Sequence, residues 1–252
     1  MSFKDSKVVI VGLGNVGATT AYSIINQGLC EEIVLIDINK EKAYGEALDM
    51  QQSVYFMNRN IKVKSGDYSD CKDADVVIIT ASAPMPKDSH DRLQMLAPSI
   101  KIIKSIVNST MASGFNGIFI VVSNPVDIMS YITWKESGLP KNQVIGSGTT
   151  LDSARLSCRL ADMYHLDAKS VSAYVCGEHG DSEMVTWSSA TIGGKSVEDV
   201  LKDNAERTKD ATKETLRHAV IEDGWQIFNR KGNTCYGIAA VSYTHLRAHE
   251  TV

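Results

Sequence analysis

Residues 8–17 read Val-Val-Ile-Val-Gly-Leu-Gly-Asn-Val-Gly, and this stretch decides how the chain folds. The β-branched run Val8–Val11 predicts a short buried strand, and the apolar stretch 16–28 has the periodicity of a helix. The glycines between them allow the tight turn that leads from a strand directly into a helix. The chain is therefore expected to begin with a strand–turn–helix unit of a parallel sheet.

The pattern of strand and helix continues through the first half of the chain. We expect further strands at 33–37, 61–63, 76–80 and 118–122, with helices near 41–56 and 93–111 between them. Strands that alternate with helices predict a parallel sheet covered on both faces, an α/β fold of the Rossmann type. We assign residues 1–146 to this dinucleotide-binding domain.

After Asn124-Pro125 the alternation loosens, which predicts a second domain of α+β type over 147–240. The expected elements are helices at 128–137 and 150–166, strands at 144–145, 171–175 and 184–190, and a long helical stretch over 197–228. This stretch is predicted to break near Gly224, and Lys231-Gly232-Asn233 is a stop signal.

Composition excludes several classes of partner. The chain has 252 residues, 43% of them hydrophobic, and a formal net charge of −4 without long runs of one sign. This charge gives no reason to expect nucleic acid or an anionic membrane as a partner, so small molecules or other proteins are favoured. The start of the chain lacks a signal-type apolar stretch, and five cysteines without a CxxC pair favour a reducing, cytoplasmic setting.

The glycine-rich turn and a following acid together favour NAD. A glycine-rich turn alone can serve purely as a turn, and an acid at a strand end can simply cap the next helix. Here Asp37 closes the second strand twenty residues after Gly17, where its carboxylate can bind both ribose hydroxyls and would repel a 2′-phosphate. We therefore expect NAD rather than NADP, bound by Gly12, Gly14, Asn15, Val16, Gly17 and Asp37.

Reactive side chains are concentrated later in the sequence. Asp152 and Arg155 are three residues apart on a predicted helix, so they share a face, although a surface ion pair is the simpler interpretation. His179 stands between glycines at a strand end, where it could also be a plain turn residue. Asn124 follows a strand at the carboxyl edge of the sheet, where ligands bind in open α/β folds.

Five stretches carry a resemblance to a known family: GLGNVG, LIDINKEKA, SGFNGIFIVVSNPVD, VIGSGTTLDSAR and CGEHGDSEMVTWSSATIGG. From Lys7 to Ala240 the chain resembles the lactate/malate dehydrogenase family, nearer to its lactate branch. The resemblance implies NAD-dependent interconversion of L-2-hydroxy acids and 2-oxo acids. It implies that His179 exchanges the proton with the substrate, that Asp152 orients this histidine, and that Arg155 binds the substrate carboxylate.

The same resemblance assigns roles to residues in loops. Arg92 would polarise the substrate carbonyl after a loop closes, Asn124 would bind the reacting oxygen and the nicotinamide ribose side, and Thr234 would line the substrate pocket. Met85 occupies the position that discriminates substrates in the family. Because methionine cannot pair with a second carboxylate, we expect pyruvate and L-lactate, with 2-oxoisocaproate or the malate–oxaloacetate pair as alternatives.

The end of the chain departs from the family pattern. Residues 241–252 read VSYTHLRAHETV and can be written back as one reading frame of a transposase-end sequencing adapter. We therefore expect a non-native tail that replaces the rest of the second domain, and we expect no metal site at His245 and His249. The resemblance implies a homotetramer for an intact chain, with a role in glycolysis and fermentation, whereas an inactive NAD-binding fragment is the alternative of another class.

Overall fold

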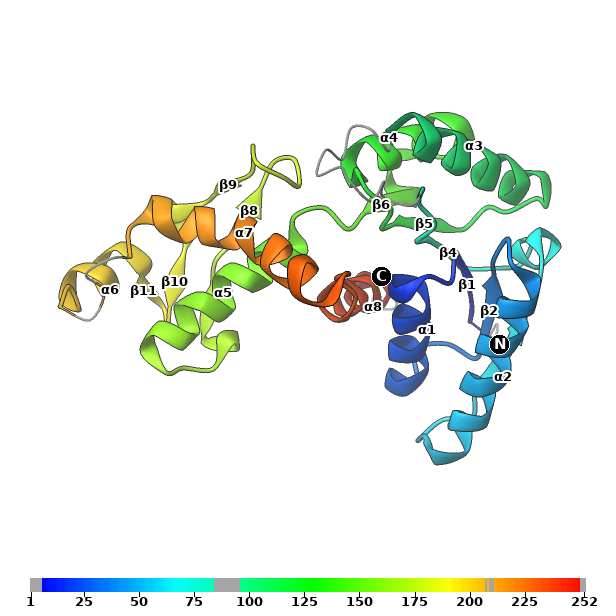
Figure 1. Cartoon of the computed structure of the whole chain (residues 1–252), viewed down its shortest axis with the longest axis horizontal. Helices are drawn as coiled ribbons and strands as arrows, with labels where there is room; N and C mark the ends of the chain where they lie inside the picture. The colour runs from blue at the N-terminus through cyan, green and yellow to red at the C-terminus, as the bar shows by residue number, and fades with distance from the viewer. Residues whose placement is uncertain (1–5, 84–95, 207, 209–210, 250–252) are drawn as a thin grey trace. The chain divides into compact units, whose positions relative to one another are not determined.

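The computed structural model of the chain describes residues 6–83, 96–206, 208 and 211–249. They divide into two compact units, of which unit 1 comprises Met1–Ser147 with Cys235–Val252 and unit 2 comprises Gly148–Thr234 (Figure 1). The division after Ser147 lies one residue from the expected domain boundary. The segment from Cys235 onward groups with unit 1, although we had placed residues 235–240 in the second domain and had set residues 241–252 apart as a tail.

Unit 1 is built on a six-stranded parallel sheet in the order β3-β2-β1-β4-β5-β6. The predicted α/β class with a parallel sheet is therefore confirmed. Each strand is short and nearly every residue of the central ones is buried, as expected for a sheet covered on both faces. The strands are β1 (Lys7–Val11), β2 (Glu32–Ile36), β3 (Lys62–Ser65), β4 (Val76–Ile79), β5 (Ile118–Val121) and β6 (Val144–Gly146).

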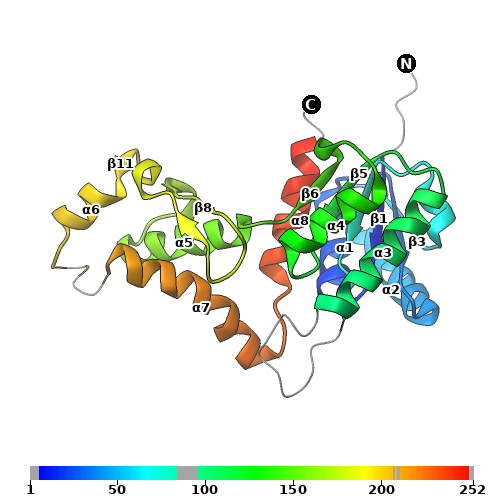
Figure 2. The ribbon, with the colours of Figure 1, turned by 90° about the horizontal axis from the view of Figure 1, so that it is seen from above.

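Alternate side chains of each strand enter two separate apolar cores. On β1, Val8 and Ile10 pack with helices α1, α2 and α8, whereas Val9 and Val11 pack with α3 and α4. The helices form one layer on each face of the sheet (Figure 2). Their bounds are α1 (Asn15–Gln27), α2 (Lys40–Ser53), α3 (Leu96–Ala112), α4 (Val126–Ser137) and α8 (Tyr236–His249).

Helix α8 differs from what the sequence predicted for the end of the chain. We expected the family pattern to stop at Val241, but α8 continues through residues 241–249 and packs on α1. The reason is spacing, because Ala239, Ser242 and Leu246 follow one another by three and four residues and are all buried. Leu246 joins the core cluster on the α1 face of the sheet.

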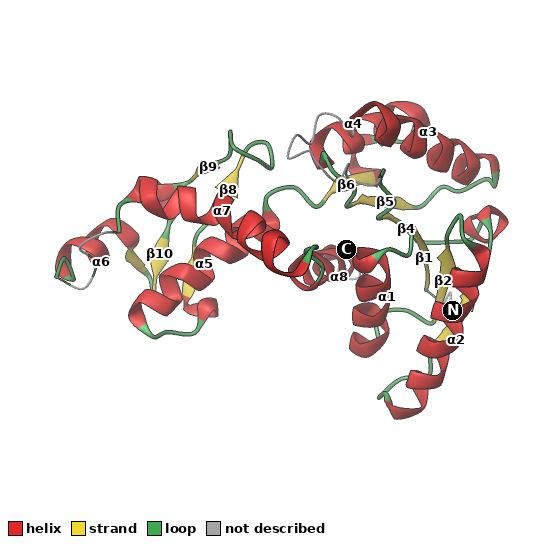
Figure 3. Ribbon diagram, viewed as in Figure 1, coloured by secondary structure: helices red, strands yellow, loops and turns green. Residues whose placement is uncertain are grey.

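Unit 2 is an α+β unit with its own apolar core (Figure 3). Leu156 and Leu160 of α5 and Val220 of α7 are fully buried in that core. The unit has one three-stranded and one two-stranded antiparallel sheet. Its elements are α5 (Thr150–Tyr164), β7 (Val171–Ser172), β8 (Val175–Cys176), β9 (Met184–Val185), β10 (Thr191–Ile192), β11 (Lys195–Ser196), α6 (Val197–Asp203) and α7 (Lys213–Lys231).

The predicted helix break near Gly224 was wrong. The helices instead separate between Asp203 and Lys213, where Thr212 forms a capping box with Thr215 at the start of α7. Helix α7 then runs through Gly224 and ends at Gly232, whose φ of 78° gives the left-handed cap that the stop signal predicted.

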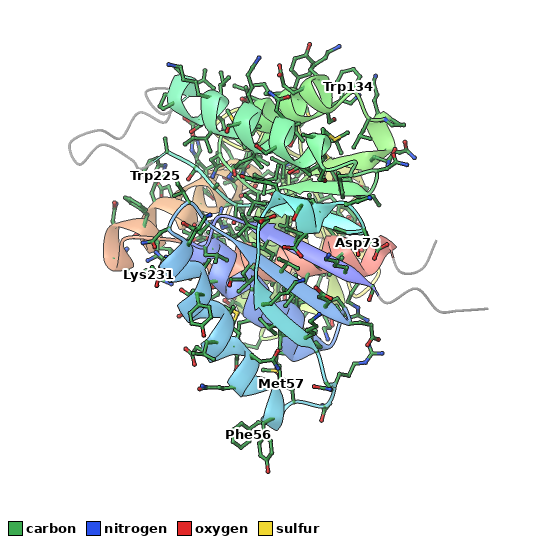
Figure 4. The ribbon with its side chains drawn as sticks, turned by 90° about the vertical axis from the view of Figure 1, so that its right-hand side faces the viewer. Phe56, Met57, Asp73, Trp134, Trp225 and Lys231 are labelled. Carbon is green, nitrogen blue, oxygen red and sulfur yellow. The ribbon has the colours of Figure 1, made fainter. Side chains whose placement is uncertain are left out.

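Two aromatic side chains stand exposed at the end of α2. Tyr55 and Phe56 are 87% and 86% exposed, and their ring centroids are 5.0 Å apart. Figure 4 shows Phe56 pointing away from the ribbon.

Within the described part of the chain, no helix combines the length and the apolar character that crossing a membrane requires.

Candidate active site

The glycine-rich turn of unit 1 is held closed by its own backbone. Gly12 is buried with a φ of 99°, and a Cβ placed on it would lie 2.6 Å from the backbone nitrogen of Ala81. A Cβ on Gly17 would lie 1.9 Å from the carbonyl oxygen of Gly12. A Cβ on Gly14, in contrast, would meet nothing within 4 Å. The first and third glycines therefore shape the turn, whereas the second leaves its outer side open.

The start of helix α1 is suited to an anion. Its N-cap is Gly14, which provides no side-chain hydrogen bond, and its first turn contains no acidic residue. The first backbone N–H groups of a helix carry partial positive charge and have no partner within the helix. With the open side of Gly14 next to them, these groups fit the pyrophosphate of a dinucleotide.

Asp37 is connected to the glycine-rich turn. Its Oδ2 accepts a hydrogen bond from the backbone N–H of Leu13 at 2.6 Å, and its Oδ1 accepts one from Asn39 at 2.9 Å. On the other side, the Thr80 hydroxyl donates to the carbonyl oxygen of Gly12 at 2.5 Å. The carboxylate predicted to bind the ribose thus also fixes the turn predicted to bind the phosphates.

In unit 2, hydrogen bonds attach the start of helix α5 to strand β8. The Thr149 hydroxyl donates to the carbonyl oxygen of Val175 at 2.6 Å, and the backbone N–H of Val175 donates to the Ser153 hydroxyl at 2.9 Å. Just after β8, Gly177 has a φ of 96°, which turns the chain toward the helix. The sequence neighbours of Asp152 and of His179 are therefore held side by side.

Asp152 is the centre of a buried charged group. Its Oδ2 lies 2.6 Å from Nδ1 of His179, and its Oδ1 accepts a hydrogen bond from Nη1 of Arg155 at 2.8 Å. The side chain of Asp152 is 1% exposed, against 13% for Arg155 and 20% for His179. The spacing of Asp152 and Arg155 had suggested a surface ion pair, but the structure shows a buried pair that also holds the histidine.

Electrostatics keeps Asp152 ionised. Burial alone would raise the pKa of this carboxyl, but the hydrogen bond and charge of His179, together with Arg155, outweigh burial and lower the pKa below its usual value. A charged Asp152 fixes Nδ1 of His179 as the nitrogen that faces the carboxylate. Nε2 is then the ring nitrogen suited to exchanging a proton with a ligand.

Glu183 is a site residue that the sequence did not reveal. Glu183 directly precedes β9, and the residue is 3% exposed. Its carboxyl offers an oxygen that lies within 4.8 Å of potential ligand atoms of Asp152 and His179. Burial and the negative charge of Asp152 raise the pKa of Glu183 to about 7. A glutamate four residues after a histidine is common, and only the tertiary fold shows that this one is buried.

The remaining predicted residues fall into three groups. Asn15 and Val16 begin α1, and Asn124 is exposed at the carboxyl end of β5, all in unit 1. Thr234 is half-buried in unit 2, between α7 and α8. Met85 and Arg92 lie outside the described residues.

The unit 2 cluster combines two chemical capabilities. A histidine oriented by an ionised carboxylate can give and take a proton near neutral pH. A planar guanidinium such as that of Arg155 can bind a ligand carboxylate through two parallel hydrogen bonds. These two groups suit a small substrate that carries both a carboxylate and an oxygen that changes its protonation state.

Comparisons with known protein families match both halves of the chain. Residues 6–146 match the lactate/malate dehydrogenase NAD binding domain, and residues 149–250 match the lactate/malate dehydrogenase alpha/beta C-terminal domain. The second match includes the residues of α8 that the sequence had suggested were foreign.

Individual relatives and solved structures agree with this assignment. The chain is 51% identical over 232 residues to L-lactate dehydrogenase 3 of Bacillus cereus, which covers 92% of this chain and 73% of that protein. It is 51% identical over 233 residues to L-lactate dehydrogenase 2 of the same species, covering 92% and 74%. The minor L-lactate dehydrogenase of Enterococcus mundtii superimposes with a TM-score of 0.91 at 43% identity, covering 96% of this chain and 76% of that one.

Proposed function

Because the chain belongs to the lactate/malate dehydrogenase family, we propose that it is an NAD-dependent L-lactate dehydrogenase that interconverts L-lactate and pyruvate. The observation that carries the proposal is the buried group of Asp152, His179 and Arg155 in unit 2. It supplies a proton-exchanging group beside a carboxylate-binding group, as a 2-hydroxy acid requires.

A cofactor bound at the glycine-rich turn and Asp37 would supply the hydride as NADH in reduction and accept it as NAD+ in oxidation. In pyruvate reduction, Arg155 binds the carboxylate of pyruvate. The carbonyl oxygen of pyruvate gains negative charge as the hydride reaches the carbon, and Nε2 of protonated His179 donates a proton to that oxygen. Asp152 holds the ring and stabilises the imidazolium before the proton leaves, because its own carboxylate stays ionised. In lactate oxidation neutral His179 takes the hydroxyl proton by the same contact. Arg92 and Asn124 would contact the reacting oxygen, and Thr234 and Met85 the substrate side chain.

The cofactor proposal rests on unit 1. Gly12 and Gly17 shape the turn, Gly14 leaves room for a pyrophosphate beside the N-terminus of α1, and Asp37 provides the acceptor for ribose hydroxyls. A carboxylate at this position disfavours the 2′-phosphate of NADP.

Kinetics with three substrates tests the proposed function. Oxidation of NADH is followed with pyruvate, 2-oxoisocaproate and oxaloacetate, and we expect pyruvate to give the highest kcat/KM. A preference for oxaloacetate by about tenfold or more, about 1.4 kcal/mol, would show that the pocket accepts a second carboxylate and would overturn the lactate assignment. NADH binding without turnover of any 2-oxo acid would instead support an inactive NAD-binding fragment.

We propose further that the enzyme is a homo-oligomer, a tetramer by family resemblance, and acts in the cytoplasm. The exposed pair Tyr55 and Phe56 supports an interface with another copy, because aromatic side chains are enriched in interface cores. No disulfide joins any of the five cysteines, all of which lie among the described residues, and this fits a reducing compartment. Light scattering on the purified chain measures the number of subunits.

A further inference from the structure

The carboxyl of Glu183 is buried, and one of its two oxygens lacks a hydrogen-bond partner in the described part of the chain. Oε1 is inaccessible to solvent and makes no hydrogen bond among the described residues. The carboxyl has a hydrogen bond with the Gly180 backbone, and the backbone N–H of Glu183 donates to the carbonyl oxygen of Gly180. Buried carboxyls are normally paired or hydrogen-bonded, because an isolated buried charge is costly. A buried carboxyl with one oxygen left unpaired, beside the proton-exchanging histidine, therefore suggests a functional role.

Geometry couples this carboxyl to the charge on His179. Potential ligand atoms of Glu183, Asp152 and His179 all lie within 4.8 Å of one another. The charge of Asp152 is balanced by Arg155 at 2.8 Å. If Glu183 ionises while His179 is neutral, the buried cluster carries an uncompensated negative charge. If His179 is protonated, the two new charges compensate each other.

The other charged groups around Glu183 do not form this partnership. On α7, Nη1 of Arg217 donates to the carbonyl oxygens of Asp181 and Glu183 at 3.2 and 3.3 Å, and Nη2 binds Glu214. On α5, the nearest charges are Asp152 and Arg155. Arg217 thus fixes the backbone of the segment and adds a modest positive potential, whereas the group facing the carboxyl with a variable charge is His179.

We infer that Glu183 is a positioning residue of the reaction, whose ionised carboxylate favours the protonated form of His179, so that pyruvate reduction persists to a higher pH than it would without this carboxylate. The inference rests on the proposed function, because it concerns the same histidine. A pKa of about 7 for Glu183 supports it, since the carboxyl then changes charge in the pH range in which such a histidine works. A divalent cation is a poorer occupant of this cluster, because Arg155 and His179 already take both oxygens of Asp152.

The test compares Glu183→Gln, which keeps the shape but cannot ionise, with the unaltered enzyme between pH 5 and 9. Near pH 5 the two should have similar kcat/KM for pyruvate. At higher pH the fall in reduction should begin earlier in the variant, by about half a pH unit or more, and the rise in lactate oxidation should also begin earlier. Glu178→Gln is the matched control, because Glu178 is an exposed carboxyl next to His179 and should leave both profiles in place.

Two further measurements keep the inference falsifiable. Titration of the His179 ring by NMR reads the same shift without turnover, so a chain that fails to reduce pyruvate still tests the coupling. Glu183→Met, similar in length and uncharged, should show the same shift if Glu183→Gln fails to fold. Unchanged profiles and an unchanged NMR titration would overturn the inference, and so would an equal loss of both reactions at every pH.

Discussion

The glycine-rich turn of unit 1 and the charged cluster of unit 2 are built in opposite ways. The turn is made of backbone, and its close backbone contacts leave no room for a side chain at Gly12 or Gly17. The cluster is made of side chains from α5 and from the β8–β9 segment, and its properties follow from charges packed together out of water. The pyrophosphate of a cofactor is unchanged by hydride transfer and can be held by a fixed backbone, whereas a substrate that exchanges a proton needs groups whose charge can change.

The largest expected effect separates chemistry from cofactor binding. His179→Asn retains a polar side chain next to Asp152 but cannot exchange the proton, so kcat for pyruvate reduction should fall about 1,000-fold. Affinity for NADH, measured by its fluorescence, should stay within about twofold, because the cofactor contacts proposed here lie in unit 1. A variant that loses NADH binding to the same degree as turnover would contradict this separation.

The second expected effect is a pH dependence of stability that belongs to the cluster. In the folded chain the pKa of Glu183 is about 7, above its usual value of 4.5, so the folded state binds more protons than the unfolded state between these values. The free energy of unfolding therefore falls as the pH rises from about 4.5 to about 7. The side chain in Glu183→Gln cannot ionise, so the variant avoids this loss of stability. At pH 8 its free energy of unfolding should exceed that of the unaltered chain by on the order of 3 kcal/mol.

Urea unfolding of Glu183→Gln and the unaltered chain at pH 5 and pH 8 measures this difference. At pH 5 the carboxyl is largely protonated in the folded chain, so most of the gain should disappear. Equal gains at both pH values would point to packing rather than to the carboxyl charge.

A smaller effect should distinguish two glycines of the same turn. Gly17→Ala forces the turn to shift, because the new Cβ would overlap the carbonyl oxygen of Gly12, and should cost about 2 kcal/mol of unfolding free energy. Gly14→Ala is the matched control, since its Cβ would meet nothing within 4 Å and should change stability by less than about 0.5 kcal/mol. Thermal unfolding of both variants without cofactor checks the ranking, and a reversed order would show that the turn has another shape.

The smallest expected effect concerns the choice of cofactor. Asp37→Asn still offers an oxygen to the backbone N–H of Leu13 but no longer repels a 2′-phosphate. The ratio of kcat/KM with NADH to that with NADPH should fall by about tenfold. An unchanged ratio would mean that Asp37 serves the turn rather than the ribose.

The glycine-rich turn shows how much can be predicted from local sequence. A β-branched strand, glycines at fixed spacing and an acid after the next strand predicted the turn and the parallel sheet, because these features act over a few residues or through one βαβ unit. Helix boundaries in unit 2 were harder. The low helix propensity of glycine predicted a break at Gly224. In the structure α7 continues through Gly224, which packs beside the guanidinium of Arg155.

The sequence by itself determined the class of the sheet, the preference for NAD and the identity of the histidine, the carboxylate and the guanidinium that we propose for the chemistry. Only the tertiary structure decided that the Asp152–Arg155 pair is buried, that Leu246 of α8 joins the core of unit 1, and that Glu183 lies next to Asp152 and His179. The reason is that burial and desolvation depend on which distant segments pack together. Local spacing gives no measure of either.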